Sequence, residues 1–216
     1  MFCNIFKFKH PTTILVAGPT QAGKTEFVKK LLQHKDTLFD PIPTNILWGY
    51  GHKNEKQIHD ILTINPHVRF YEGLPDLDDI DISQNTLLIL DDLMDELGKT
   101  KEYANLFTRG SHHDNITVIA IIHNIFNQQK HTRTISLNTR YYVLFKSPRD
   151  NQQIQHFGRQ IFPNNKMFVS EALRQATSKR FGYLIIDLHT QTPESLRVCT
   201  GIFPKEIPLV FIPKTI

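Results

Sequence analysis

The sequence has few cysteines and no long apolar run, and both absences limit its function classes. Cys3 and Cys199 are its only cysteines. Two cysteines give neither a disulfide framework nor a metal motif, so we expect a reducing, intracellular setting. No apolar run approaches the roughly 20 residues of a membrane-spanning helix, and the first residues are too charged for a signal peptide. We therefore expect no membrane insertion.

Neither sign of charge dominates the chain. It carries 25 Lys and Arg residues against 21 Asp and Glu residues, a formal net charge of +4. This balance permits a polyanionic partner but does not require one. The 216 residues predict a single domain, residues 1–216, with the strands of about 181–216 as an appendage.

What the sequence does contain is a glycine-rich loop of the form Gly-x4-Gly-Lys-Thr, from Gly18 to Thr25. An apolar, strand-like run over 12–17 precedes it, and apolar residues at helical spacing follow it in 27–32. A strand, a glycine loop and a helix in this order predict a nucleotide-binding P-loop.

Each part of this loop has a physical role in holding ATP and Mg²⁺. The glycines let successive backbone N–H groups face the phosphate oxygens, and the helix that follows adds its positive end. Lys24 is expected to reach the β- and γ-phosphates, and the Thr25 hydroxyl to ligate Mg²⁺. The predicted nucleotide contacts are Gly18, Pro19, Thr20, Gln21, Ala22, Gly23, Lys24, Thr25 and Glu26.

The rest of the chain alternates apolar runs with helical patterns. The runs 44–50, 67–73, 86–92, 116–124 and 140–146 read as strands, and 54–64, 100–110 and 148–161 read as helices. This alternation predicts an α/β P-loop NTPase fold, a three-layer sandwich around a mainly parallel sheet. The runs 181–191 and 207–213 are expected to add an antiparallel C-terminal extension, the last as an edge strand.

Two acidic residues end one of these strands. The run 87–90 leads directly into Asp91 and Asp92. In a P-loop protein this Walker B strand is expected beside the P-loop strand, with Asp91 reaching Mg²⁺. Asp92 then occupies the position of a residue that activates or orients water. The alternative is an acidic strand end without a catalytic role.

A further polar pair, His123 and Asn124, ends the strand of 117–122. Ligands bind at the carboxyl ends of strands in open α/β sheets, so either residue is a candidate sensor of the γ-phosphate. The alternative is that both cap the next turn. His112 and His113 lie upstream without a spaced third ligand, which disfavours a zinc site.

Together the segments "GPTQAGKT", "LLILDD" and "SHHDNITVIAIIHN" resemble the FtsK/HerA-type DNA-packaging ATPases. These occur in double-stranded DNA viruses with double-jelly-roll capsids and in related Polinton/adintovirus-like elements. The resemblance covers roughly residues 10–160, and the tail also looks similar. His123 stands where glutamine is usual in the family, whereas Asn124 matches.

The resemblance implies a ring, a pentamer or a hexamer, that threads double-stranded DNA and packages a viral genome by hydrolysing ATP between subunits. A neighbouring subunit then supplies an arginine to the transition state. Arg109 is the first candidate because it precedes the sensor strand, and Arg149 is the second. Arg140 is expected only to flank a strand end.

DNA contact in such a ring is expected to be with phosphates, independent of base sequence. The candidates are Lys99 and Lys101 after the Walker B strand, and Lys130 and Arg133 after the sensor strand. The resemblance also implies a capsid or portal-vertex partner. It implies a location in the host nucleus, a viral factory or the virion.

Two other functions fit a P-loop. A small-molecule (nucleotide) kinase would need an arginine-rich lid and an acceptor site, and the paired acids suit a hydrolase better. A helicase or replication ATPase shares the same motifs. A GTPase is disfavoured because the run "NNKM" at 164–167 lacks the aspartate of a guanine signature.

Overall fold

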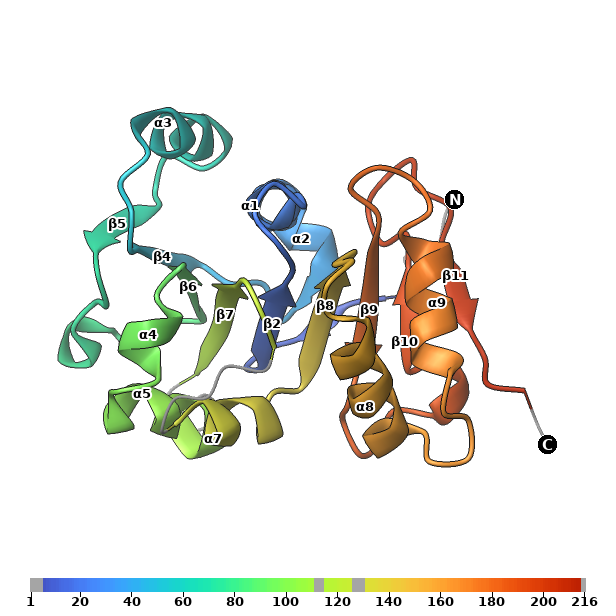
Figure 1. Cartoon of the computed structure of the whole chain (residues 1–216). Coiled ribbons are helices and arrows are strands. Elements are labelled where there is room, and N and C mark those ends of the chain that lie inside the picture. The colour runs from blue at the N-terminus through green and yellow to red at the C-terminus, as the bar shows by residue number, and fades with distance from the viewer. Residues whose placement is uncertain (1–5, 111–114, 126–130, 215–216) are drawn as a thin grey trace.

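The computed structural model describes residues 6–110, 115–125 and 131–214. Its centre is a nine-stranded sheet with the strand order β11-β10-β9-β8-β2-β7-β6-β4-β5 (Figure 1). The strands are β2 (Thr13–Ala17), β4 (Asn45–Tyr50), β5 (Arg69–Glu72), β6 (Thr86–Asp91), β7 (Ile116–Ile122), β8 (Tyr141–Phe145), β9 (Tyr183–Asp187), β10 (Val198–Thr200) and β11 (Leu209–Phe211). A separate small sheet pairs β1 (Phe8–Lys9) with β3 (Phe39–Asp40).

The sheet is parallel from β5 to β8 and antiparallel beyond that strand. The last three strands, β9 to β11, each run opposite to their neighbours, and β11 lies at the edge. This confirms the predicted mainly parallel sheet with an antiparallel C-terminal extension.

Helices cover both faces of the sheet (Figure 1). One face packs against α1 (Lys24–Gln33), α2 (Lys35–Leu38) and α3 (Glu55–Ile64). The other packs against α4 (Met94–Leu97), α5 (Lys101–Asn105), α7 (Thr132–Leu137), α8 (Asn151–Ile161) and α9 (Phe168–Ala176). Short 3-10 turns are η1 (Leu77–Asp79) and η3 (Glu194–Leu196), and η2 (Leu106–Gly110) is a π-helical turn.

Alternation along the strands divides the core between these two faces. In β2, Leu15 and Ala17 face one cluster, whereas Ile14 and Val16 face the other. All five residues of this strand are buried, as expected for a strand covered on both sides. The predicted three-layer sandwich is therefore confirmed.

The position of the predicted Walker B strand differs from the prediction. The sequence places β6 beside β2, but β7 lies between them and pairs with both. All seven residues of β7 are buried. A strand this apolar is most stable in the middle of the sheet, where both of its faces and both of its edges are covered.

One predicted helix also differs. The helical pattern over 100–110 forms α5 and then continues as η2.

Within the described ranges, no helix is both long and apolar enough to cross a bilayer.

Candidate nucleotide site

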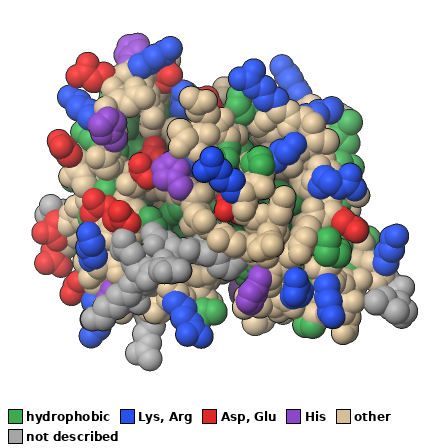
Figure 2. Space-filling view, viewed as in Figure 1, with side chains coloured by type: hydrophobic (Ala, Val, Ile, Leu, Met, Phe, Trp, Pro, Cys, Tyr) green, Lys and Arg blue, Asp and Glu red, His purple; other side chains and the backbone are tan. Residues whose placement is uncertain are grey.

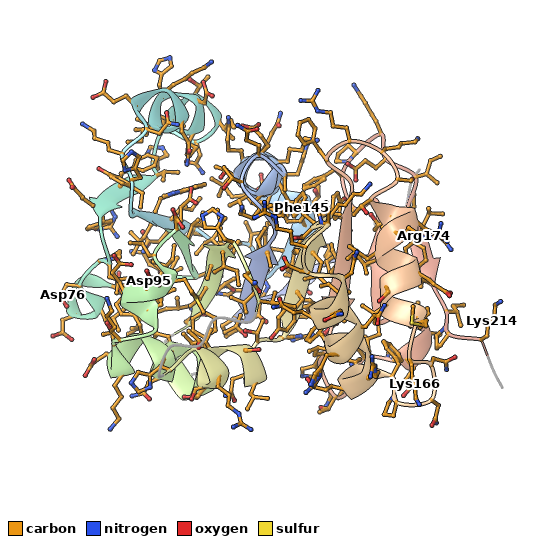
Figure 3. All side chains as sticks on the ribbon, in the orientation of Figure 1. Asp76, Asp95, Phe145, Lys166, Arg174 and Lys214 are labelled. Atoms are coloured by element: carbon orange, nitrogen blue, oxygen red, sulfur yellow. The ribbon has the colours of Figure 1, made fainter. Side chains whose placement is uncertain are left out.

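The loop between β2 and α1 has the backbone geometry of an anion-binding turn. Gln21 and Gly23 both adopt left-handed conformations, with φ of 64° and 103°. Such a turn directs successive N–H groups toward one centre. Gly18 packs so tightly that an added Cβ would lie 2.7 Å from the Cβ of Phe145. Phe145 lies beneath α1 (Figure 3), so the loop is held against β8.

Lys24 is folded into this loop. Its Nζ donates hydrogen bonds to the carbonyl oxygens of Gly18 at 2.7 Å and Pro19 at 2.9 Å. The side chain is buried, and burial lowers the pKa of Lys24, while the charges of Asp91 and Asp92 act in the opposite direction. An anion bound in the loop would supply the negative charge that this buried ammonium lacks.

Strand register brings the predicted site residues to one edge of the sheet. Asp91 lies opposite Ile121, and Ala17 lies opposite Ile122. The residues that follow these strands, among them Gly18 and His123, therefore meet at the carboxyl edge, where open α/β sheets bind ligands. The Gly18 N–H donates to the carbonyl oxygen of Ile122 at 3.2 Å, which ties the P-loop to the end of β7.

Asp91 is partly buried and is held by a residue that the sequence did not single out. Its Oδ2 accepts a hydrogen bond from Gln57 Nε2 of α3 at 2.9 Å. Burial raises the pKa of Asp91, and the Gln57 hydrogen bond opposes that shift. The sequence carried no signal for Gln57, because only the pairing of β4 with β6 brings α3 next to Asp91.

Asp92 and His123 form an exposed pair beside Asp91. His123 Nε2 lies 3.0 Å from Asp92 Oδ1. Asp92 adopts a left-handed backbone conformation with φ of 58°, which aspartate tolerates better than most residues. Asn124, the other candidate sensor, follows His123 and is partly exposed.

The residues at this edge fit ATP and Mg²⁺. Mg²⁺ prefers oxygen ligands and keeps several waters, and the Thr25 hydroxyl with the Asp91 carboxylate are such ligands. The loop and Lys24 fit a polyphosphate. Thr20, Gln21 and Glu26 are exposed, while Pro19, Ala22, Gly23 and Thr25 are partly buried. The Glu26 carboxylate is engaged by Lys29 at 2.9 Å, which leaves its backbone N–H as its contribution to the site.

The three arginine candidates lie in different places. Arg109 belongs to η2, ahead of the first residue of β7. Arg149 is exposed after the carboxyl end of β8, the strand next to β2. Arg140 flanks the start of β8, where its Nε lies 3.5 Å from Asp187 Oδ1, as expected for a structural residue.

The DNA-contact candidates come from two stretches that the fold brings together. The backbone N–H of His131, next to α7, donates to the carbonyl oxygen of Gly98 at 3.2 Å. Exposed Lys99, Lys101 and Arg133 flank this contact. The acids Asp95, Glu96 and Glu102 are also exposed in these stretches. Lys130, like His112 and His113, lies outside the described residues.

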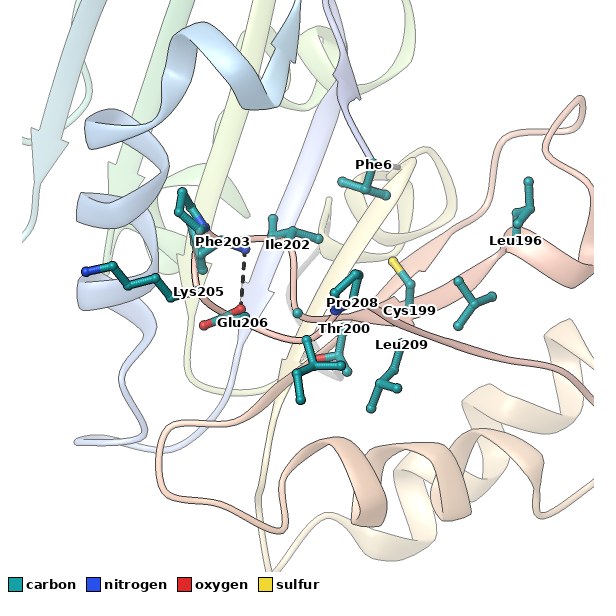
Figure 4. Close-up of a pocket in the computed structure, with 14 residues that line it drawn as sticks. Phe6, Leu196, Cys199, Thr200, Ile202, Phe203, Lys205, Glu206, Pro208 and Leu209 are labelled. Carbon is teal, nitrogen blue, oxygen red and sulfur yellow. Dashed lines mark hydrogen bonds between the residues drawn. The ribbon is translucent and has the colours of Figure 1, made fainter. Parts of the chain in front are cut away.

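A cavity of about 440 Å³ lies elsewhere, at the C-terminal strands (Figure 4). Its described lining comprises Phe6 and residues between 196 and 210, and includes none of the predicted site residues. The wall is mainly apolar, with Ile207 and Leu209 half exposed or more. This cavity is therefore separate from the candidate nucleotide site.

The fold is shared with known ATPases. The chain superposes on the genome packaging NTPase B204 of Sulfolobus turreted icosahedral virus 2, solved in complex with ATP-gammaS, with a TM-score of 0.50 and 14% identity. The match covers 95% of this chain and 98% of that chain. The DNA-packaging ATPase B204 of Sulfolobus turreted icosahedral virus gives a TM-score of 0.53 with 10% identity, and the same two coverages, 95% and 98%.

A third similar structure is EssC (ATPases 2 and 3) from Geobacillus thermodenitrificans, with a TM-score of 0.54 and 11% identity. The match covers 95% of this chain but 40% of that chain. No protein-family model and no curated protein matches the chain. At these identities the likeness establishes the fold, which agrees with the suspected resemblance to FtsK/HerA-type packaging ATPases.

Proposed function

We propose that this protein hydrolyses ATP to drive double-stranded DNA through a ring of its own copies, and so packages a viral genome into a capsid. The observation that carries the ATPase part is the carboxyl edge of the sheet. There, Lys24 with its loop, Asp91 with Gln57, and the Asp92–His123 pair follow strands that lie in register.

Each residue of this edge has a role in phosphoryl transfer to water. Lys24 and the loop N–H groups hold the β- and γ-phosphates. Thr25 and Asp91 hold Mg²⁺, which neutralises charge on the phosphates when bound. Asp92 orients the attacking water and accepts its proton, and His123, 3.0 Å away, fixes the carboxylate. Asn124 is the second candidate sensor.

The DNA-packaging part rests on two likenesses. The three sequence segments resemble packaging ATPases, and the two B204 structures that share the fold are described as a genome packaging NTPase and a DNA-packaging ATPase. Packaging implies sequence-independent contact with DNA phosphates and a capsid or portal-vertex partner. It also implies work in the host nucleus or a viral factory, or in the virion.

The distribution of surface charge supports a ring. The acidic flank consists of the exposed residues Asp76, Asp78, Asp95, Glu96 and Glu102 around η1, α4 and α5, and Lys99 and Lys101 are exposed among them. The basic flank consists of the exposed residues Lys166, Arg174 and Lys214 near α9 and the C-terminus. Figure 3 shows labelled members of the two flanks on opposite sides of the molecule, and Figure 2 shows most of the acidic side chains on the side of the acidic flank, with Lys and Arg side chains on both sides.

Two different and complementary flanks are what a head-to-tail ring requires. Such a ring joins one surface of a subunit to another surface of the next. Opposite potentials on these surfaces favour that contact over the like-charged alternatives. Hydrolysis at subunit interfaces then needs an arginine from a neighbour, for which Arg109 and Arg149 are the candidates.

The test is ATP hydrolysis with and without linear double-stranded DNA of several unrelated sequences. We expect stimulation by all of them alike, with apparent DNA affinity falling steeply as salt rises, through counterion release. The Lys24→Ala variant, folded but without the phosphate-binding cation, is the control and should not hydrolyse ATP. A rate of ATP hydrolysis that does not change when DNA is added would overturn the proposed translocase function. Phosphate transfer to a nucleotide acceptor would instead identify a kinase.

A further inference from the structure

The turn between α9 and β9, residues 177–182, lies against the P-loop although it is far away in sequence. A Cβ added to Gly23 would lie 2.9 Å from Cδ1 of Phe181. The Phe181 ring therefore packs on the glycine that precedes α1. The residue is nonetheless 54% exposed, so much of the aromatic surface is available to a ligand.

Beside this contact, a cavity of about 250 Å³ lies between the turn and the P-loop. Gln21 and Ala22 line one side, Phe181 lines the other, and Lys146 contributes from the end of β8. The volume is below the roughly 300–1,000 Å³ of a site that encloses a whole drug-sized ligand. The cavity suits one part of a ligand whose remainder is bound next door.

The backbone of the turn is strained in a way that presents the aromatic ring. Phe181 has φ of 61°, a conformation that bulky residues rarely adopt. Gly182 is required beside it, since an added Cβ would lie 2.3 Å from the carbonyl oxygen of Ala176. Strain of this kind persists where the surrounding fold enforces it, and it concentrates at ligand sites.

The charge of the cavity favours an anionic ligand. Of the described residues that line it, Lys146, Lys179 and Arg180 are cationic and none is acidic. The guanidinium carbon of Arg180 lies 4.6 Å from the centroid of the Phe181 ring. An aromatic ring and a guanidinium plane are the two surfaces on which nucleobases stack.

The orientation expected for a nucleotide in the P-loop places its nucleoside at this cavity. The groups expected at the terminal phosphate, Asp91, Asp92 and His123, follow β6 and β7 on one side of β2. The cavity lies on the opposite side of β2, beyond β8 and ahead of β9. Consider a nucleotide whose terminal phosphate lies at Asp91, Asp92 and His123 and whose other phosphates lie in the P-loop. Its nucleoside must extend toward this cavity.

We propose that this cavity is the nucleoside subsite of the nucleotide site. The base stacks on the Phe181–Arg180 pair, and Lys146 and Lys179 face the ribose and the α-phosphate. This inference rests on the proposed function to the extent that a nucleotide occupies the P-loop. It adds the residues that recognise the part of the nucleotide that does not react.

The test compares ATP with inorganic tripolyphosphate, which has the phosphates but no nucleoside. Affinities are measured by calorimetry with Mg²⁺ present. The wild-type protein should bind ATP more tightly than tripolyphosphate. Phe181→Ala should weaken ATP binding by about 5- to 150-fold, the range expected for one lost stacking contact, and leave tripolyphosphate binding unchanged. Phe181→Tyr keeps the ring and should restore the affinity for ATP.

Backbone strain is controlled with Phe181→Asn, because asparagine adopts the left-handed conformation readily but offers no ring. It should weaken ATP binding as Phe181→Ala does. The subsite would be overturned if the wild-type protein bound ATP and tripolyphosphate with equal affinity. It would also be overturned if the Phe181 variants weakened the binding of both ligands equally, or of neither. Lys24→Ala should weaken the binding of both ATP and tripolyphosphate. Failure of the wild-type protein to bind either ligand would instead overturn the proposed nucleotide site.

Discussion

Asp91 and Asp92 are adjacent in sequence but occupy different environments. Asp91 ends β6, is partly buried and accepts a hydrogen bond from Gln57. Asp92 turns away through a left-handed conformation, is exposed and contacts His123. One carboxylate is fixed by the protein, as the proposed Mg²⁺ ligand should be, and the other faces the solvent, as the proposed water-orienting residue should.

The first prediction separates these two roles. Asp91→Asn removes a charged Mg²⁺ ligand and should raise the Mg²⁺ concentration needed for ATP binding by more than tenfold. Asp92→Asn should leave ATP binding intact and lower kcat by about 10²- to 10⁴-fold, the usual value of general base catalysis. Asparagine tolerates the backbone of residue 92, so the fold is kept. Normal turnover by the Asp92 variant would assign the base to another residue.

The second prediction concerns Gln57, which donates a hydrogen bond to Asp91 and so orients the proposed Mg²⁺ ligand. Gln57→Leu removes the donor 2.9 Å from Asp91 Oδ2 at a similar side-chain size. Residues that orient metal ligands typically change metal affinity by about 10- to 100-fold, so the Mg²⁺ dependence of ATP binding should shift by that amount. Gln152→Leu, at an exposed position of α8, is the control. An unchanged Mg²⁺ titration would make the contact structural only.

At the scale of elements, apolar periodicity predicted which segments form strands but not which strands are neighbours. The runs around β4, β6, β7 and β8 were recognised because they are short, apolar and bounded by polar residues. The same pattern cannot tell that β7 lies between β2 and β6, since sheet order depends on how crossovers pack. Helix α9 was not predicted, although buried Val169, Ala172 and Leu173 have helical spacing.

Some residues of the candidate site could likewise be predicted from the sequence, and others could not. The P-loop and the two acids could be read from the sequence because their parts are consecutive in the chain. Gln57 and the turn of 177–182 could not, because tertiary packing alone brings Gln57 to Asp91 and the turn to the P-loop. The turn could not be predicted without α9, because this helix positions it. Thr177 Oγ1 donates a hydrogen bond to the carbonyl oxygen of Leu173 at 2.7 Å.

A buried histidine joins the segment that precedes β2 to the start of β7. His10 Nδ1 lies 2.7 Å from Thr117 Oγ1, and its Nε2 lies 3.1 Å from Asn115 Oδ1. The neutral imidazole satisfies both contacts, with one nitrogen donating and the other accepting. Burial lowers the pKa of His10, and its hydrogen bonds to Asn115 oppose that shift.

The third prediction follows from the sign of this shift. Because the folded pKa is below the unfolded value of about 6.5, the unfolded chain binds more protons as pH falls below that value. The free energy of unfolding should therefore decrease from pH 7 to pH 5, by at most about 1.4 kcal/mol per pH unit from this residue. Denaturant unfolding at several pH values measures it.

His10→Gln, which does not titrate, should flatten this part of the pH profile. His67→Gln, at an exposed position, should leave the slope as in the wild-type protein. A slope that is the same in both variants would trace the acid sensitivity to other groups.

At the scale of the whole molecule, the length of one strand separates the backbone of Arg109 from the P-loop of the same chain. Arg109 lies in η2 before β7, and Lys24 follows β2 at the opposite end of the parallel pair. The seven residues of β7 span roughly 20 Å. In the proposed ring, an arginine at that end would act on the nucleotide of a neighbouring subunit, whereas Arg149, after the carboxyl end of β8, is placed nearer its own P-loop.

The fourth prediction tests this difference by mixing inactive variants. Lys24→Ala lacks the phosphate-binding lysine, and Arg109→Ala lacks the proposed trans arginine. Each should be inactive alone, since a single kind of subunit leaves every interface incomplete. In a mixture, some interfaces pair an intact Lys24 with an intact Arg109, and ATP hydrolysis should partly return. An arginine supplied in trans is worth about 10³- to 10⁵-fold in kcat, so even a minority of complete interfaces is measurable.

The same mixing distinguishes a trans arginine from a cis one. If Arg149 acts within its own subunit, Arg149→Ala mixed with Lys24→Ala should stay inactive, because no subunit then carries both groups. Specific activity of the wild-type protein should also rise with protein concentration as rings form, and should fall at high salt if the acidic and basic flanks hold neighbours together. Concentration-independent turnover, with no recovery in the Arg109 mixture, would contradict hydrolysis at subunit interfaces. It would indicate a site completed within one chain, as in a kinase.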